Sequence, residues 1–264
     1  IRHVMELNIY QLAAFTAESF GGNPAAVFPL DSWIDDELMQ KIAAENNLPE
    51  TAYFVPTGDS EWEIRWFTPA VEIDLCGHGT LASAAVIRSL GHDIWPITLR
   101  SRSGHLKVDV SADQFVLDFP SSPPCQIDVP EGLEDALGTQ VNDCLQGGEM
   151  LLVTLDDELA VATLRPDFGK LAGIIEHGLI ITSRGDEVDF VSRFFAPSIG
   201  IDEDPATGSA HCVLTPYWSA ILLKGTLEAR QISSRVGYLV CEDAGERTLI
   251  KGSTVFFLSG TITV

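Results

Sequence analysis

The residues best suited to chemistry lie in two short segments, each running from the end of a strand into the start of a helix. The first corner is residues 74–81, DLCGHGTL, and the second corner is residues 204–211, DPATGSAH. The free N–H groups and the dipole at a helix start favour a bound anion. We therefore expect each corner to bind a carboxylate or an enolate-like transition state. Two ordinary capped helices are the alternative interpretation.

Both corners combine glycines, which let a ligand approach the backbone closely, with polar side chains that can donate hydrogen bonds or cap a helix. The candidate residues are Cys76, Gly77, His78 and Gly79 in the first corner and Asp204, Thr207, Gly208 and Ser209 in the second. At a helix start, the pKa of the Cys76 thiol is expected to be low. Cys212 lies a turn inside the second helix, where core packing is expected.

A third candidate, Glu50, lies where a helix ends and an apolar strand begins. Asn46, Asn47 and Pro49 end the helix, and residues 51–55 form the start of the strand. A carboxylate against apolar walls is suited to take and return a proton near neutral pH. A solvated loop glutamate is the alternative.

The elements that position these residues occur twice. Residues 65–84 and 193–212 match at an offset of 128, with six identities in twenty positions. Each copy follows a strand-like run and precedes a helix rich in small residues. Many antiparallel strands with one long helix per half indicate an α+β class with two similar domains. Residues 159–163 are predicted to be a strand and residues 166–175 a helix.

The domain boundary is predicted at the sequence SSPP, residues 121–124. The N-terminal domain is expected to span residues 1–122 and the C-terminal domain residues 123–254. The last strand, 255–264, is expected to cross back to the first domain.

Charge and cysteine content exclude several classes of protein. The 264 residues include 38 acidic and 16 basic side chains, a net charge of −22. Nucleic acids and anionic membranes need a clustered basic surface, so neither is an expected partner. Five cysteines without a CxxC pair favour a reducing cytoplasm. The phosphate-binding patterns GxGxxG after a strand and GxxxxGK[ST] do not occur.

Four motifs in order resemble the PhzF family of phenazine biosynthesis-like proteins. They are GGNPAAV (21–27), ENNLPETAY (45–53), RWFTPAVEIDLCGHGTLASA (65–84) and IDEDPATGSAHC (201–212). The resemblance implies a diaminopimelate epimerase-like fold: two pseudo-symmetric domains, each a curled, mostly antiparallel sheet around a central helix, with the active site in the cleft between them. It also implies a homodimer that uses neither a cofactor nor a metal.

The resemblance further implies a cofactor-independent isomerase or epimerase that moves a proton on a small carboxylate substrate. By motif match the general acid/base is Glu50, and His78, Asp204 and Ser209 contact the ligand. His78 and Asp204 are expected to be catalytic, because they would orient the polar groups of the substrate and stabilise developing charge. Asn23 would line the cleft. Gly79 departs from many relatives, which carry Ala or Pro there, and is expected to loosen the corner. Trp66 is assigned to the core.

Three other interpretations remain open. Diaminopimelate epimerase and proline racemase, which share the fold, use one cysteine from each corner, but the second corner here has no thiol. A two-base scheme would instead use Cys76 with Glu50. The protein could also bind a small molecule without catalysis. A zinc site would draw on Cys76, His78, His211 and Cys212, although the spacing is unusual for zinc.

Overall fold

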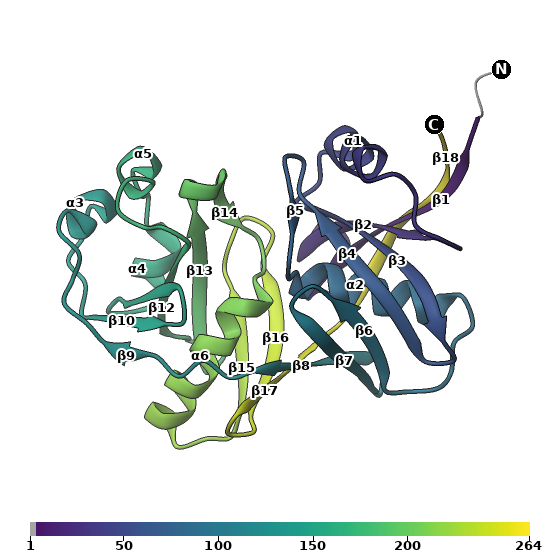
Figure 1. The fold of residues 1–264 in the computed structure, drawn as a ribbon. Coiled ribbons are helices and arrows are strands. Elements are labelled where there is room, and N and C mark those ends of the chain that lie inside the picture. Colours follow the sequence, from purple (N-terminus) through teal and green to yellow (C-terminus); the bar gives the residue numbers. More distant parts are fainter. Residues whose placement is uncertain (1–3) are drawn as a thin grey trace. The chain divides into compact units, whose positions relative to one another are not determined.

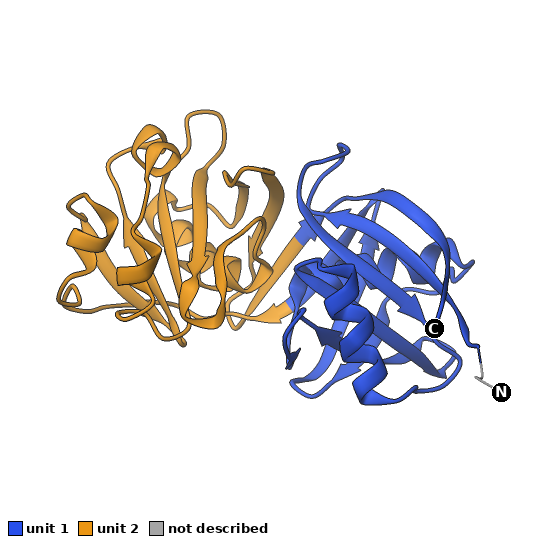
Figure 2. Ribbon diagram, turned by 90° about the horizontal axis from the view of Figure 1, so that it is seen from above, with its two compact units in different colours: residues 1–118, 251–264 blue, residues 119–250 orange. Residues whose placement is uncertain are grey.

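The computed structural model describes residues 4–264, whose contacts divide into two units (Figure 2). Unit 1 comprises the chain up to residue 118 together with residues 251–264, and unit 2 comprises residues 119–250. The chain passes from one unit to the other within β8 (Gln114–Pro120) and again within β17 (Arg247–Gly252). In residues 4–264 no helix has the length and apolar character needed to span a membrane.

Unit 1 is a mostly antiparallel sheet with two helices (Figure 1). Its further strands are β1 (Glu6–Ala14), β2 (Asn23–Pro29), β3 (Glu50–Gly58), β4 (Glu61–Phe67), β5 (Glu72–Ile73), β6 (Ile97–Ser101), β7 (Gly104–Ser111) and β18 (Thr254–Thr263). Its helices are α1 (Asp36–Asn46) and α2 (Gly77–Ser89). Parallel pairing joins β2 to β3 and β4 to β6, and the other pairs are antiparallel.

Unit 2 repeats this plan. Its further strands are β9 (Cys125–Gln126), β10 (Asp143–Gly147), β11 (Met150–Thr154), β12 (Gly178–Arg184), β13 (Phe190–Ala196), β14 (Ile201–Asp204), β15 (Thr226–Gln231) and β16 (Gly237–Asp243). Its helices are α3 (Leu133–Leu137), α4 (Glu158–Thr163), α5 (Phe168–Leu171), the 3-10 turn η1 (Pro197–Ile199) and α6 (Gly208–Leu222). The parallel pairs β11–β12 and β13–β15 correspond to β2–β3 and β4–β6.

The prediction of an α+β class with a duplicated plan is confirmed by these matching pairings. The offset of 128 holds between the strand pairs β3–β4 and β12–β13, where Ala52 pairs with Trp66 and Ile180 pairs with Phe194. It grows to 131 at the helices, because α2 begins at Gly77 and α6 at Gly208. The second corner is thus three residues longer, and the matches proposed beyond the strands do not correspond in structure.

Alternation along the strands divides each unit into two cores. Tyr53 and Phe67 pack with α1 in one core, whereas Trp66 stands on the opposite face. In α2 every residue from 78 to 87 is buried, which is typical of a helix enclosed on all sides. The small side chains at positions 82–85 allow the sheet to enclose the helix this closely. Each sheet therefore has a central helix on one face and shorter helices on the other.

One element differs in type from its prediction. Residues 159–163 lie in helix α4, not in a strand, because the Asp157 side chain accepts a hydrogen bond from Ala160 N and caps the helix start. Likewise the helix predicted over 166–175 is limited to α5, residues 168–171.

Candidate active site

The strand register brings three side chains of unit 1 to one face of the sheet. Glu50 is the first residue of β3 and pairs with Ala25 of β2, so Asn23, two residues before Ala25, shares its face. Trp66 of β4 pairs with Ala52, which is two residues after Glu50. Because side chains alternate along a strand, Asn23, Glu50 and Trp66 all point to the same side of the sheet.

His78, in the first turn of α2, connects Glu50 to Asn23. Its Nε2 lies 2.7 Å from Glu50 Oε2, within ion-pair distance although not aligned as a regular hydrogen bond. Its Nδ1 lies 3.1 Å from Asn23 Nδ2. Glu50 is 6% exposed and His78 4%. The carboxylate is therefore not a solvated loop group, and the imidazole is held at both nitrogens.

Cys76 completes this group as the N-cap residue of α2. Its Sγ accepts a hydrogen bond from Gly79 N at 3.2 Å and lies 3.6 Å from His78 Nδ1 and 3.9 Å from Nε2. Thiol, imidazole and carboxylate thus form one buried cluster, which we call the Glu50 cluster and which comprises Glu50, Cys76 and His78. The sequence predicted all three residues but not their mutual contact.

Burial and charge act in opposite directions on this cluster. Burial raises the pKa of the Cys76 thiol, although His78 and the Gly79 N–H oppose that effect. The prediction of a low pKa at the helix start is therefore wrong. Burial by itself lowers the pKa of His78, but Cys76 and the Glu50 carboxylate raise it well above its usual value. His78 is therefore expected to be an imidazolium near neutral pH.

The protonation of His78 Nδ1 depends on whether the Asn23 side chain presents its Nδ2 or its Oδ1 to the ring. With Nδ2 toward the ring, His78 Nδ1 accepts and Nε2 carries the proton toward Glu50. The opposite amide orientation presents Oδ1, to which an imidazolium Nδ1–H can donate. Asn23 can therefore serve either charge state of His78.

Gly79 is a tight position, contrary to the expectation that it loosens the corner. A Cβ added there would lie 2.8 Å from Trp66 Cδ1 and 3.0 Å from Cys76 Sγ. The missing side chain is what admits the Trp66 indole to the first corner. Among residues 4–264 the buried Trp66 Nε1 has no hydrogen-bond partner, and buried indole N–H groups usually have one.

The second corner forms a hydrogen-bonded network within unit 2. Asp204 and Thr207 are each 8% exposed, and the Thr207 hydroxyl donates a short hydrogen bond to Asp204 Oδ2. Gln231 accepts from Thr207 N at 2.8 Å and donates to Asp204 O at 2.7 Å. Gly208 is buried and Ser209 half-buried at the start of α6. Thr207 occupies the N-cap position of α6 without a side-chain capping bond. Gln231 lies in none of the sequence motifs, so sequence reasoning missed it.

Unit 2 has no counterpart of the Glu50 carboxylate. The position that corresponds to Glu50 in the strand register is Gly178, and Phe194 corresponds to Trp66. A Cβ on Gly178 would lie 2.4 Å from Phe194 Cζ, so the phenyl ring fills the space of a side chain. At this register position a carboxylate therefore occurs in unit 1 and not in unit 2.

Metal-binding atoms also group at the Glu50 cluster. One sulfur, one imidazole nitrogen and one carboxylate oxygen lie within 4.8 Å of one another, a donor set that zinc accepts. His211 and Cys212 of the predicted zinc set lie outside this group. His211 Nδ1 instead donates to Thr207 O at 2.8 Å, and burial lowers its pKa to about 4.

The fold is that of epimerases. A hydroxyproline epimerase from Agrobacterium vitis superposes with a TM-score of 0.66 over 98% of this chain and 93% of that chain, at 8% identity, which shows the fold alone. A PhzF-family protein from Enterococcus faecalis, solved by crystallography, superposes with a TM-score of 0.94 at 42% identity, over 98% of this chain and 100% of that one. The predicted epimerase-like fold is confirmed.

The sequence comparisons define the family. The model of the phenazine biosynthesis-like family (PhzC-PhzF) matches residues 12–260. A Pseudomonas aeruginosa protein named as an uncharacterized isomerase is 49% identical over 98% of this chain and 99% of its own length. The chain therefore belongs to the PhzC-PhzF, phenazine biosynthesis-like family, as the four motifs predicted.

Proposed function

We propose that the protein is an isomerase that moves a proton on a small carboxylate substrate, with Glu50 as the general acid/base. The observation that carries this proposal is the buried Glu50 carboxylate, 2.7 Å from His78 Nε2. Burying a carboxylate costs stability even when it is paired, and a positioned carboxylate is a common proton carrier. The isomerase name of a relative 49% identical supports the reaction class.

The reaction would proceed in two proton transfers. Glu50 Oε2 is held by His78, so Oε1 would take a proton from an acidic C–H beside a carbonyl, an enamine or a conjugated system. The electron pair of that bond would remain on the substrate as an enolate-like anion, and Glu50 would become a neutral acid. Return of a proton from Glu50 to a different carbon, or to the other face, would complete an isomerisation or an epimerisation. Exchange of the Glu50 proton with solvent between the two transfers would place solvent deuterium on the product.

His78 and Trp66 would act on the charge that develops. The His78 imidazolium orients Glu50 before the transfer, and its proximity stabilises negative charge in the transition state. The indole N–H of Trp66, buried without a partner in the described chain, would donate to a substrate oxygen. A Trp66→Phe variant removes this donor and keeps a ring, so we expect a lower kcat with the fold intact.

Asp204, Thr207, Gly208 and Ser209 enter the proposal as substrate-binding groups. Their support is the buried network around Asp204, which fixes its carboxylate through Thr207. An Asp204→Asn variant tests this role, because it keeps the side-chain shape but removes the charge. We expect a raised KM for the substrate, and an unchanged KM would exclude Asp204 from binding.

Turnover is tested by incubating the enzyme with a panel of 2-hydroxy, 2-amino and dihydroaromatic acids in D₂O. Mass spectrometry then detects deuterium in the recovered acid. A general base contributes about 10²–10⁴-fold, so Glu50→Gln should lose at least that factor while still binding the ligand. Absence of label across the panel in the presence of measurable binding would favour a non-catalytic binding protein.

A two-base reaction is the second candidate, because Cys76 Sγ lies within 4.8 Å of the Glu50 carboxylate in the same buried cluster and could act with Glu50 as the second acid or base on the substrate. Cys76→Ser separates the two schemes. In the one-carboxylate scheme the serine variant retains most activity, since serine can still cap α2. In the two-base scheme it loses activity as severely as Glu50→Gln.

We also propose the homodimer that is common for this fold. Sedimentation at equilibrium should give twice the chain mass of 28.6 kDa. A mass equal to one chain would contradict it.

A further inference from the structure

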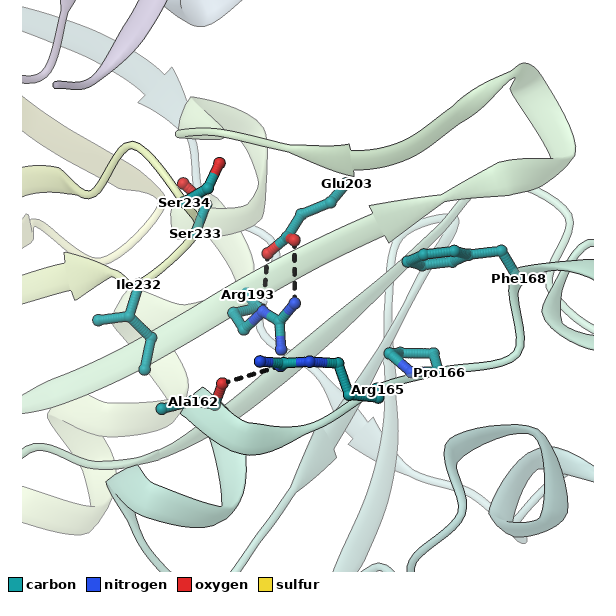
Figure 3. Close-up of a pocket in the computed structure, with 9 residues that line it drawn as sticks. All are labelled: Ala162, Arg165, Pro166, Phe168, Arg193, Glu203, Ile232, Ser233 and Ser234. Carbon is teal, nitrogen blue, oxygen red and sulfur yellow. Dashed lines mark hydrogen bonds and ion pairs between the residues drawn. The ribbon is translucent and has the colours of Figure 1, made fainter. Parts of the chain in front are cut away.

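Unit 2 contains a pocket of about 470 Å³ whose lining residues are all separate from the Glu50 cluster and the second corner (Figure 3). Phe168 and Pro166 form one side of the pocket, and Ile232 with Ser233 and Ser234 forms another. The volume falls in the range of small-molecule sites. The guanidinium groups of Arg165 and Arg193 lie side by side at its base.

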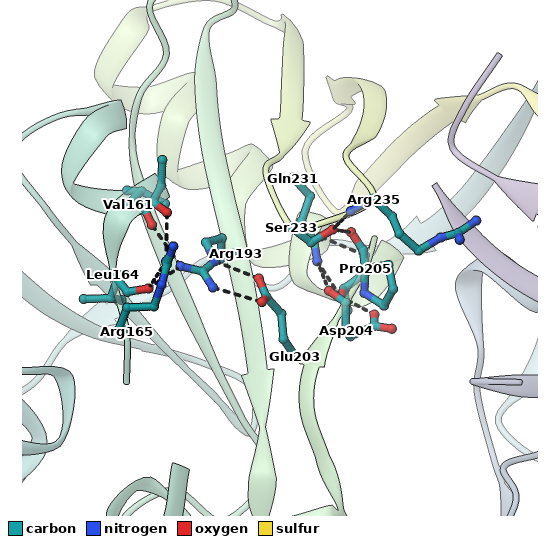
Figure 4. A network of polar contacts seen from close by, with 12 residues as sticks. Val161, Leu164, Arg165, Arg193, Glu203, Asp204, Pro205, Gln231, Ser233 and Arg235 are labelled. Carbon is teal, nitrogen blue, oxygen red and sulfur yellow. Dashed lines mark hydrogen bonds and ion pairs between the residues drawn. The ribbon is translucent and has the colours of Figure 1, made fainter. Parts of the chain in front are cut away.

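Of the two arginines, only Arg193 has a carboxylate partner among the described residues. Arg193 is buried and forms a bidentate ion pair with Glu203, through Nε at 2.7 Å and Nη2 at 2.9 Å. The Nη1 atoms of Arg193 and Arg165 both donate to Leu164 O, each at 2.8 Å (Figure 4). Arg165 makes no ion pair with any residue that the structure describes. One positive charge at this pocket is therefore not neutralised, in a chain of net charge −22.

The duplicated plan provides an internal comparison. In unit 1 the arginine that corresponds to Arg193 is Arg65, which pairs with both Glu72 and Asp36. A second arginine, Arg102, contacts Glu72 and lies 4.0 Å from Asp74 Oδ1, so two arginines face three carboxylates. In unit 2 the Arg193 Nη1 meets backbone carbonyls of Val161 and Leu164, in the place of an aspartate. The excess of positive charge is thus specific to unit 2.

We propose that this pocket binds a small organic monocarboxylic acid, with its carboxylate on Arg165 and its apolar body against Phe168 and Ile232. A guanidinium offers a planar pair of donors that matches a carboxylate. The negative charge of Glu203 is neutralised by its ion pair with Arg193, so Glu203 does not repel the ligand strongly. The apolar walls favour a ring or branched chain over a bare anion such as phosphate. One unneutralised arginine matches one negative charge.

The proposal does not depend on the proposed function, since no lining residue belongs to the Glu50 cluster. The probes are benzoate, its uncharged analogue benzamide, acetate and inorganic phosphate. Each is titrated into the full-length protein, with binding followed by calorimetry and by two-dimensional NMR. Glu50→Gln is the control for the other candidate site, because it changes the charge at the Glu50 cluster and leaves every lining residue of the pocket in place.

We expect benzoate to bind at one site per chain in the wild type and in Glu50→Gln, with the largest shifts at Arg165, Phe168 and Ile232. Arg165→Gln should weaken it at least about tenfold. Arg165 is exposed and makes only backbone hydrogen bonds, so that variant should fold, which circular dichroism checks. Arg165→Lys keeps the positive charge but lacks the planar pair of donors, so its benzoate affinity should lie between those of the wild type and Arg165→Gln.

Three results would overturn the proposal. They are equal benzoate affinity in Arg165→Gln, equal binding of benzamide, and affinity for acetate or phosphate as high as for benzoate. The first result would show that Arg165 does not bind the carboxylate. The second would show that the negative charge of the ligand does not contribute to binding, and the third that contact with Phe168 and Ile232 does not.

Discussion

Gly79→Ala should destabilise the protein, although alanine is normally favoured over glycine in a helix. The new methyl group would lie 2.8 Å from Trp66 Cδ1 and 3.0 Å from Cys76 Sγ, closer than packed carbon atoms approach. Alanine gains up to about 1 kcal/mol in a helix, whereas overpacking a dense core costs about 1–3 kcal/mol. The net expectation is a loss of about 0–2 kcal/mol.

The assay is urea unfolding followed by circular dichroism, with Gly173→Ala as the matched control. A Cβ on Gly173 would be 3.6 Å from its nearest neighbour, Lys170 O, an ordinary contact. The control should be neutral or slightly stabilised, whereas Gly79→Ala should unfold at lower urea. Equal stabilisation of both variants would show that the first corner has room to spare and would refute the packing argument.

Three further outcomes follow from the buried titratable groups. The Glu50 carboxylate raises the pKa of His78, so the stability that this pair contributes is complete below about pH 6.5 and is lost as the pH rises through the folded-state pKa. NMR should show His78 titrating at lower pH in Glu50→Gln. An unchanged titration would show that Glu50 is not the cause of the shift. Burial lowers the pKa of His211 to about 4, so about 3 kcal/mol of stability should be lost as the pH falls from about 6.5 to 4. In pH-dependent unfolding, His211→Gln should lose less stability over this range. An equally steep loss would show that His211 is not its source. Burial raises the pKa of Cys76, so iodoacetamide at pH 7 should label the exposed Cys125 first, as peptide mass spectrometry can show, whereas faster labelling of Cys76 would indicate an exposed thiolate.

Much of the fold could be predicted because its signals are local. Strand periodicity and the repeated motif indicated the α+β class, and the small residues of α2 indicated an enclosed helix. The strand predicted at 159–163 failed because the run LAVAT suits either structure, and the deciding feature is the cap from Asp157. The constant offset failed at the helices because the second corner contains three more residues before its helix begins.

The members of the Glu50 cluster could be named from motifs, but their contacts depend on strand register. Asn23 meets His78 because β2 and β3 pair in parallel at Ala25 and Glu50. Trp66 looked like a core residue because it lies in a buried apolar strand, and its unpartnered N–H is visible only in three dimensions. The pKa of Cys76 was misjudged because a helix start was weighed without the burial that opposes it.

The central claim is that Glu50 alone carries the substrate proton. The most direct test is the rate of solvent-deuterium incorporation into a substrate found in the panel, measured side by side for wild type, Glu50→Gln and Cys76→Ser. We predict that Glu50→Gln loses at least about 10² in rate with its ligand affinity preserved, while Cys76→Ser stays within about tenfold of wild type. Wild-type incorporation by Glu50→Gln would contradict the account.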